Sequence, residues 1–420
     1  MKFPALSMLA LAALCLGVVV QSAPAAATAE PDWPCWRGPT RDGIAAPGQH
    51  PPTEWSETNN VLWKVAIPGR GHGSPTVVGG FIYLPTADPS KRTQSVLCLN
   101  RQDGKLVWQT EVFGADADPG KQANSSAASS TILCDGGRLY VNFLNNGAVY
   151  TTALDLKGKP VWQTKVCDFV VHQGFASSPV LHGDLILVSA DHRGGGTIVG
   201  LSKRDGRVVW TVDRPKIPNY TSPSIVKAAG STQLVLAGCN LITSLDPTTG
   251  NKLWELEGST EECVTTVVTD GERVFCSGGY PKNHTVAVQA DGSKKIAWQN
   301  NARVYVPSMM VKAGHLFAVM DAGLAVCWKA DTGEEIWKER LGGDFFASPV
   351  MVGDRIYAVN VQGKGFVFEA TPKAFKLISQ NQLGNEAYAS PVICGSRLYL
   401  RVATKGESRQ EWLYCLGTRQ

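Results

Sequence analysis

A phrase of one form recurs along this chain and constrains its fold more than any other feature. In "SLDPTTGNKLW" (Ser244–Trp254) two short apolar pieces surround a turn, and a tryptophan follows. Similar phrases end at Trp108, Trp162, Trp210, Trp254, Trp298 and Trp337. With Trp63 included, successive tryptophans are 39 to 54 residues apart. A period of this size indicates a stacked or radial array of repeated units.

The glycine and the tryptophan of the phrase have separate physical roles. In five of the six phrases the glycine precedes the tryptophan by four residues: Gly104, Gly158, Gly206, Gly250 and Gly333. Gly292 lies two residues further back. Glycine reaches positive φ without steric cost, so a strand can end there in a short turn. The next strand alternates its side chains, and we expect its tryptophan to bury its ring between neighbouring units.

A second phrase, of the type "SSPVLH", marks the start of each unit. It begins at eight positions: Ser74, Ser129, Ser178, Ser222, Thr265, Pro307, Ser348 and Ser390. A turn signal and an apolar strand follow it, so each unit reads as four strands. No sustained helical period occurs outside the first residues. Eight four-stranded units predict an all-β chain, an eight-bladed β-propeller of four-stranded antiparallel blades.

The ends of the chain indicate how the ring closes. The unit that begins at Ser390 has no room for a tryptophan strand before Gln420, whereas "NNVLWKVAIP", with Trp63, is a tryptophan strand without a start. We therefore expect the N-terminal strand to complete the last blade, which leaves no radial edge unpaired. The seventh unit is degenerate, and in it Leu377 is expected to take the tryptophan position.

The first 29 residues predict a secretory signal peptide. One lysine is followed by an apolar run from about Ala5 to Val20 and by an A-x-A site at Ala27-Thr28-Ala29. The apolar run is short for a membrane anchor, which needs about 20 residues. We expect residues 30–60 to form an N-terminal extension and 61–420 the propeller. The mature chain is expected to be exported, periplasmic or secreted, without a transmembrane segment.

Charge and cysteine usage exclude several classes of function. The chain has 40 basic and 36 acidic residues and no basic run of five or more, which argues against nucleic-acid binding. Its 11 cysteines include no C-x-x-C, so zinc ribbons and thioredoxin-like redox chemistry are unsupported. Five cysteines recur at two repeat positions, which favours apolar packing: Cys98, Cys327, Cys415, Cys134 and Cys394. Cys263 and Cys276 flank a hairpin, where a disulfide between them is one alternative and two free thiols are the other.

The repeat resembles that of the pyrroloquinoline quinone (PQQ) enzymes, A-x-D-x-x-T-G-x-x-x-W. The best matches are Asp246, Thr249, Gly250 and Trp254, followed by Asp331, Thr332, Gly333 and Trp337. The resemblance spans about Val61 to Gly417 and implies a propeller in which each tryptophan docks on the next blade. The segment "DWPCWRGPTRDGIA" also resembles the leader strand of exported quinone-repeat proteins of planctomycete-type bacteria.

Two groups of proteins share this repeat: quinone-dependent dehydrogenases, and non-catalytic scaffold proteins of outer-membrane assembly. The resemblance to the dehydrogenases implies a Ca²⁺ site, an aspartate base and, in alcohol-oxidising members, a disulfide between adjacent cysteines. This chain has no Cys-Cys pair and no C-x-x-C-H haem motif. The soluble glucose-oxidising type lacks the paired cysteines too, so a PQQ- and calcium-dependent alcohol or sugar dehydrogenase remains the alternative.

The residues that precede the start phrases are the candidate ligand-binding residues, because they surround the mouth of the central channel. They are His72, His172, Phe175, Tyr220, Glu261, Glu262, Arg303, Tyr305, Phe345, Glu386 and Tyr388. Such a funnel of aromatic and polar groups is typical of a binding site, although loop ends of any propeller are rich in these residues. Glu261 and Glu262 either bind a cation or belong to an acidic loop that is exposed to solvent.

The sequence thus favours an exported, non-catalytic binding or scaffold protein of the cell envelope. We expect an envelope protein as partner, a monomeric chain, no catalytic residue and no cofactor. PQQ and Ca²⁺ belong only to the dehydrogenase alternative. A third possibility is a receptor that binds a small molecule or glycan in the funnel. The repeat fixes an architecture, and function depends on sites placed on it.

Overall fold

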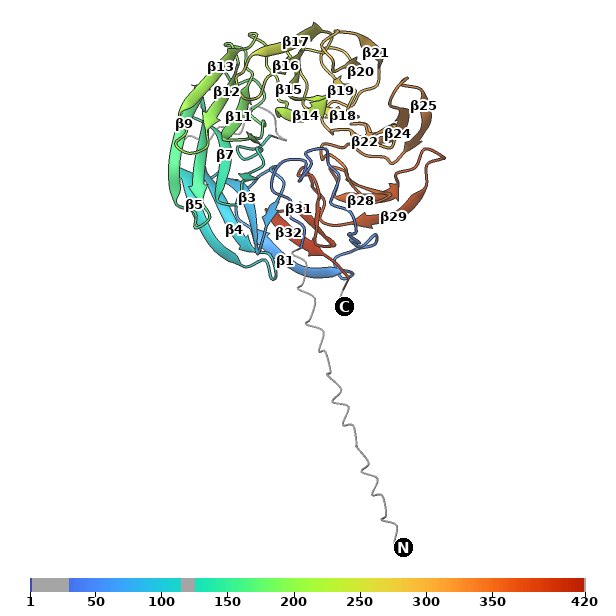
Figure 1. Ribbon diagram of the computed structural model, residues 1–420. Coiled ribbons are helices and arrows are strands. Elements are labelled where there is room, and N and C mark those ends of the chain that lie inside the picture. The colour runs from blue at the N-terminus through green and yellow to red at the C-terminus, as the bar shows by residue number, and fades with distance from the viewer. Residues whose placement is uncertain (2–29, 115–124, 419–420) are drawn as a thin grey trace.

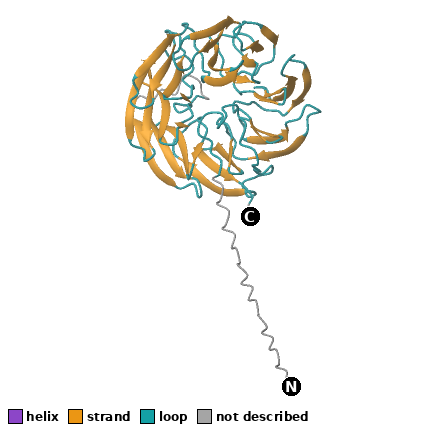
Figure 2. Cartoon of the chain, in the orientation of Figure 1, coloured by secondary structure: helices purple, strands orange, loops and turns teal. Residues whose placement is uncertain are grey.

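The computed structural model describes residue 1, residues 30–114 and residues 125–418. The predicted signal peptide falls outside these residues. The described chain consists of strands, turns and loops, arranged as a ring of eight sheets around a central channel (Figures 1 and 2). No helix long and apolar enough to cross a membrane occurs within the described residues. The predicted eight-bladed all-β propeller is confirmed.

Blades 1 to 4 are four-stranded antiparallel sheets in chain order. Their strands are β2 (Thr76–Val78), β3 (Phe81–Asp88), β4 (Thr93–Asn100), β5 (Leu106–Phe113); β6 (Leu133–Cys134), β7 (Arg138–Asn145), β8 (Ala148–Asp155), β9 (Pro160–Asp168); β10 (Val180–His182), β11 (Leu185–Ala190), β12 (Thr197–Ser202), β13 (Val208–Asp213); β14 (Ser224–Ala228), β15 (Ser231–Gly238), β16 (Leu241–Leu245) and β17 (Lys252–Glu257). The first strand of each lies nearest the channel and the fourth lies outermost.

Blades 5 to 8 follow the same plan, and the last of them joins the two ends of the chain. Their strands are β18 (Val268–Thr269), β19 (Arg273–Gly278), β20 (His284–Gln289), β21 (Ile296–Asn300); β22 (Met310–Lys312), β23 (His315–Val319), β24 (Leu324–Lys329), β25 (Glu335–Arg340); β26 (Val350–Val352), β27 (Arg355–Val359), β28 (Lys364–Glu369), β29 (Leu377–Gln382); β30 (Val392–Cys394), β31 (Arg397–Lys405), β32 (Arg409–Leu416) and β1 (Val61–Ile67). β1 pairs with β32, as expected from the sequence.

The repeat tryptophans dock against the glycine turn of the following blade, except for Trp337, which donates to the Thr371 carbonyl in a turn without glycine. A Cβ added to Gly104 would lie 2.7 Å from the Trp63 ring, and one added to Gly158 would lie 2.7 Å from Trp108. Gly104 has a φ of 72°, so the turn also needs positive φ. Most of the indoles add a hydrogen bond, as when Trp63 Nε1–H donates to the Arg101 carbonyl at 3.3 Å. The glycine is therefore required both for the turn and for the close approach of the ring.

A second set of contacts links the blades at the channel. Just before seven of the eight inner strands, a hydroxyl accepts the main-chain N–H of the equivalent residue in the preceding blade. Seven of these bonds occur among the described residues, with donor–acceptor distances of 2.8–3.1 Å: Ser74 to Thr131, Thr131 to Ser178, Ser178 to Ser222, Thr266 to Ser308, Ser308 to Ser348, Ser348 to Ser390, and Ser390 to Ser74. In three blades the residue of this series lies one or two positions beyond the predicted start: Thr131, Thr266 and Ser308.

Blade 7 corrects one expectation. Val367 of β28 pairs with Ser379, as Cys327 pairs with Trp337 in blade 6, so Ser379 and not Leu377 occupies the tryptophan position. The same register bulge occurs in blade 6, but the turn of blade 7 is two residues longer, because it closes from Glu369 to Lys376 where that of blade 6 closes from Lys329 to Glu334. Sequence comparison of the repeats missed these two extra residues.

The N-terminal extension supplies the ring that blade 7 lacks. Trp55 is 4% exposed and stacks on Tyr357, with centroids 6.3 Å apart and planes inclined by 13°. The equivalent residue in blade 6, Phe317, meets its own blade's Trp337 at 6.2 Å. Ser379 donates to the Thr53 carbonyl and so helps to hold the extension in place.

The cysteines in the described part of the chain are unpaired. All ten cysteines of the described chain are free, and nine of them are buried. Cys263 and Cys276 therefore form no disulfide in this structure. Burial raises the pKa of the Cys98 and Cys327 thiols to about 12. These groups pack as small apolar side chains, as their recurrence at one repeat position indicates.

Replacing Trp55 tests its role in blade 7. Trp55→Ala is expected to lower the free energy of unfolding by about 3–5 kcal/mol, because a buried ring is lost and a cavity is left. Chemical denaturation gives this value, with Trp337→Ala as the matched control expected to cost a similar amount. A loss below about 1 kcal/mol for Trp55→Ala alone would show that the extension does not stabilise blade 7.

Candidate functional site

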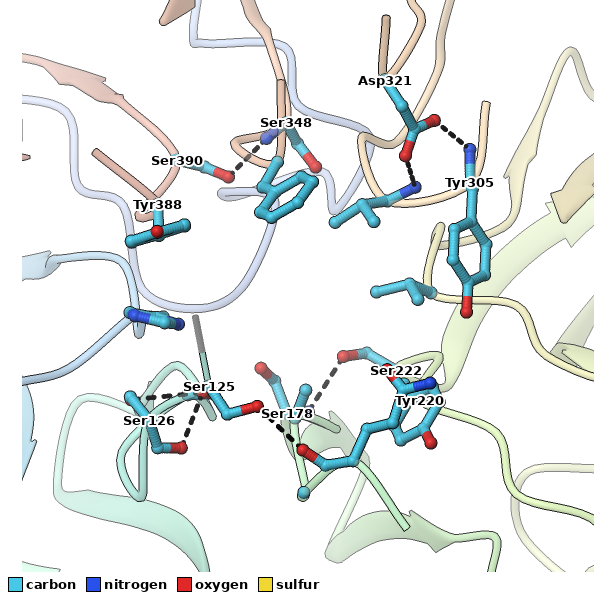
Figure 3. A pocket seen from close by; sticks show the side chains of 18 of the residues that line it. Ser125, Ser126, Ser178, Tyr220, Ser222, Tyr305, Asp321, Ser348, Tyr388 and Ser390 are labelled. Carbon is cyan, nitrogen blue, oxygen red and sulfur yellow. Dashed lines mark hydrogen bonds between the residues drawn. The ribbon is translucent and has the colours of Figure 1, made fainter. Parts of the chain in front are cut away.

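A cavity of about 590 Å³ lies at the centre of the ring. It opens on the face where each outer strand leads into the next inner strand, called here the funnel face (Figure 3). Residues from most blades contribute to its wall, since every blade sends one connecting loop to this face. The cavity is large enough for a small-molecule ligand, for which pockets of about 300–1,000 Å³ are usual.

The N-terminal extension lies across the channel at the floor of this cavity. Trp36 lines the cavity and donates its indole N–H to the Thr266 hydroxyl of blade 5 at 2.8 Å. Trp33 forms a β-bridge with Val77 of blade 1. Arg37 is buried and donates to the Met309 and Pro349 carbonyls, which lie before the inner strands of blades 6 and 7. The extension thus crosses from one side of the ring to the other.

One part of the cavity wall is a row of neighbouring rings that are tilted against one another. The His72 imidazole lies 4.4 Å from the Tyr388 ring, and Tyr388 lies 5.9 Å from Phe346. Burial and the charges of Arg70, Arg401 and Arg409 hold the pKa of His72 well below its usual range. His72 is therefore neutral at neutral pH and contributes a flat, polarisable face.

Glu262 is the centre of a polar cluster on the opposite part of the wall. Its side chain is 2% exposed and accepts the Tyr305 hydroxyl at 2.9 Å and the Gln173 amide at 3.5 Å. His172 Nε2 lies 3.4 Å from the second carboxylate oxygen. Burial and the Glu262 charge raise the pKa of Tyr305, so its phenol stays protonated and donates. Four loops converge in this cluster when the adjacent Tyr220 is included.

Two other acids near the funnel are also paired with groups of the chain. Asp321 accepts the main-chain N–H of Tyr305 at 2.7 Å and that of Val306 at 3.2 Å. Burial raises the pKa of Asp321, while these hydrogen bonds act against the rise. Glu386 is held by Arg409 at 2.7 Å. These three carboxylates, Glu262, Asp321 and Glu386, therefore serve loop positioning first.

The structure divides the residues that sequence reasoning selected. Six of them line the cavity: His72, Phe175, Tyr220, Arg303, Tyr305 and Tyr388. Five do not: His172, Glu261, Glu262, Phe345 and Glu386. Phe345 is fully buried in the core, 5.8 Å from the Phe366 ring, and its neighbour Phe346 faces the cavity instead. Glu261 contributes its main-chain carbonyl, which accepts the Cys239 N–H.

Several lining residues were missed from sequence. Ser178, Ser222, Ser348 and Ser390 border the cavity, as do Trp36, Asp321 and Asp344. The serines had a signal, because they recur in the start phrase, yet that phrase was read only as the beginning of a strand. Asp321 follows the second strand of blade 6. Nothing in the sequence pattern places the loop after that strand beside the loop that leads into blade 7.

Comparison with protein families assigns the chain. The family model described as "Outer membrane protein assembly factor BamB" matches residues 52–169, 92–319 and 295–372. The chain belongs to this family. Among curated proteins, tetrathionate hydrolase of Acidithiobacillus ferrooxidans is 21% identical over 359 residues, which cover 73% of this chain. The match spans 66% of the length of that hydrolase.

Solved structures share the fold at low sequence identity. BamB from Moraxella catarrhalis matches with a TM-score of 0.62 and 14% identity, over 84% of this chain and 99% of that one. A europium-containing methanol dehydrogenase matches with a TM-score of 0.67 and 11% identity, over 92% of this chain and 98% of that one. The quinohemoprotein alcohol dehydrogenase ADHIIG from Pseudomonas putida HK5 matches with a TM-score of 0.67 and 11% identity, over 93% and 81%.

The residues of the funnel do not match the donor set of a Ca²⁺–quinone centre. Ca²⁺ takes six to eight oxygen ligands, several of them carboxylates. The described residues contain no group of three or more His, Cys, Asp and Glu side chains placed to hold a metal ion. Glu262 and Asp321 are bonded to donors of the chain. No chemical step through PQQ or Ca²⁺ follows from this arrangement.

The low pKa of His72 predicts a pH dependence of stability. The folded protein keeps His72 neutral, whereas the unfolded chain binds a proton near pH 6.5. The stabilisation is therefore present above about pH 6.5 and is lost as the pH falls, by up to about 1.4 kcal/mol per pH unit. His72→Gln is expected to lose less unfolding free energy between pH 7.5 and 5.0 than the wild type. Equal losses in urea denaturation would contradict this.

Proposed function

We propose that this protein is an exported, non-catalytic binding protein of the cell envelope that holds a partner protein at the funnel face. The proposal is supported by membership of the outer-membrane assembly factor family. The N-terminal extension crosses the channel, so the ring presents one open face. The proposal assigns recognition of the partner to that face.

The single observation that carries the non-catalytic assignment is the pairing of two funnel acids, Glu262 and Asp321. General acid–base chemistry needs a side chain that is within reach of a substrate and free to exchange a proton. Glu262 is tied to Tyr305 and Gln173, and Asp321 to two main-chain N–H groups. What faces the cavity in their place is a set of aromatic rings and hydroxyls, which suits recognition.

The rim of the funnel carries the contact surface that we assign to the partner. Val170 and Tyr280 are each 53% exposed, and neither belongs to the repeat. Tyr280 pairs with Glu262 through a β-bridge, and Val170 adjoins the hairpin of Arg193, whose guanidinium lies 3.0 Å from His172. We call Val170, Arg193 and Tyr280 the rim patch.

The exposed apolar residues of the outer strands differ from the rim patch. They include Leu106, Val107, Val161, Val208, Val209, Leu253 and Ile296, which recur one or two positions before the repeat tryptophan. Recurrence in successive blades marks them as part of the repeat. An exposed tyrosine and valine that break the repeat are better candidates for contacts that are specific to this chain, since tyrosine is enriched at interfaces.

Charge substitution in the rim patch tests the proposal. The tagged chain is expressed in its native host, and the envelope proteins that copurify after mild crosslinking are quantified. The double variant Val170→Asp/Tyr280→Asp is expected to lose at least about tenfold of the captured partner, because a desolvated interface does not accept unpaired charge. Val209→Asp on the outer strand is the matched control and should capture the same amount. Capture that is unchanged in the rim variant, or lost in the control, would contradict the proposal.

A further inference from the structure

The floor of the funnel is bordered by hydroxyl groups that have a proton to give. The Ser178, Ser222, Ser348 and Ser390 oxygens each accept a main-chain N–H from the preceding blade, at 2.8–2.9 Å. Within the described residues none of these four hydroxyls donates a hydrogen bond. All four line the cavity (Figure 3). Inter-blade bonding therefore fixes the oxygens and leaves four donors around one axis.

Tyr220 adds an independent donor at the same cavity. Its side chain is 9% exposed, and its hydroxyl has no hydrogen-bond acceptor in the described part of the chain. Burial and the Glu262 charge raise the pKa of Tyr220, which keeps the proton in place. Tyr305 beside it donates to Glu262, so that carboxylate is already engaged. A buried phenol whose proton has no acceptor is costly unless a ligand supplies one.

The walls above this floor offer flat rings and acceptors. His72, Tyr388 and Phe346 form a continuous row of rings, and Tyr305 stands across the cavity beneath the Arg303 guanidinium. The Asp321 carboxylate and the exposed Asp344 also border the space. The cavity therefore combines donors at its floor, aromatic faces on its sides and carboxylate acceptors near its mouth.

We propose that the funnel binds a neutral saccharide. Ring and hydroxyl oxygens of a sugar would accept from the serine and Tyr220 hydroxyls, and its own O–H groups would donate to Asp321 and Asp344. Its C–H faces would lie on the row formed by His72, Tyr388 and Phe346. The volume of about 590 Å³ has room for a small saccharide.

Other ligand classes fit these observations less well. An oxoanion would meet two carboxylates in the same wall, and an alkyl chain would leave the floor donors without acceptors. An extended peptide presents its carbonyls along a line, whereas these donors come from blades 3, 4, 7 and 8 around the axis. A neutral ligand that carries hydroxyls on all sides satisfies the arrangement.

The saccharide site goes beyond the proposed protein partner and is separable from it. The rim patch and the cavity floor share none of their residues. A rim variant that loses its partner should still bind the saccharide, and a floor variant that loses the saccharide should still capture the partner. The failure of one proposal is therefore visible without the failure of the other.

Isothermal titration calorimetry of the mature chain tests the proposal. The probes are glucose, galactose, mannose, N-acetylglucosamine and their common disaccharides, with sodium sulfate and a mixture of neutral tripeptides as comparison ligands. At least one saccharide is expected to saturate one site per chain. Tyr220→Phe should weaken its binding about tenfold, because one hydrogen bond to the ligand is lost. Tyr388→Ala should weaken it at least tenfold, and Tyr83→Phe, buried in blade 1 outside the funnel, should bind like the wild type.

The contrary results are equally clear. Absence of saturation by every saccharide, or binding of sulfate or of the tripeptides in their place, would overturn the proposal. So would a Tyr220→Phe variant that binds the saccharide as tightly as the wild type. Tyr220→Phe removes one oxygen atom and should keep the fold, which the thermal midpoint of unfolding verifies.

Discussion

In most blades of this ring an indole reaches into the glycine turn of the next blade. The contact is asymmetric, because the tryptophan belongs to one blade and the turn to the next, and so it propagates around the ring. The approach is close enough that a Cβ on Gly104 or Gly158 would overlap the ring. A radial array without such wedges would leave its sheets free to slide, since four short strands bury little surface alone. Closure of the ring then removes the last unpaired edge.

The N-terminal segment repairs the two places where the repeat fails. β1 completes blade 8, which the C-terminal end of the chain leaves one strand short. Trp55 stacks on Tyr357 where Ser379 has replaced the repeat tryptophan. Earlier in the same segment, Trp36 and Arg37 lie across the channel and join blades 5, 6 and 7. The same segment that stabilises the ring therefore confines the candidate site to one face.

Much of the architecture was predictable from the sequence, and the reasons are local. The four-residue spacing from Gly250 to Trp254 follows from one turn and one strand, so the blade count and the closure by Trp63 could be read directly. Ser379 was missed because the turn before it is two residues longer than the turn of blade 6. Phe345 was chosen over Phe346 for a different reason: adjacent residues of an extended chain face opposite sides, and proximity to a start phrase does not say which of the two faces the cavity.

The candidate site was less predictable because its contacts are long-range. Sequence proximity to a start phrase does select a loop on the funnel face, as His72 and Tyr388 show. It does not say which groups neutralise each other there. Glu262 meets Tyr305 from the next blade and Gln173 from a blade two positions back, and Trp55 meets Tyr357 across some 300 residues of chain. Such pairs follow from the curvature of the ring.

The most direct test of the central claim, that the funnel is a recognition site and not a quinone centre, is a titration of the mature protein with PQQ and Ca²⁺. Binding is followed by calorimetry, and turnover by dye-linked oxidation of alcohols and sugars. The account predicts no saturable quinone binding at high micromolar concentration and no oxidation. Saturable binding with turnover would contradict it and would make Asp321 and Glu262 the first residues to substitute.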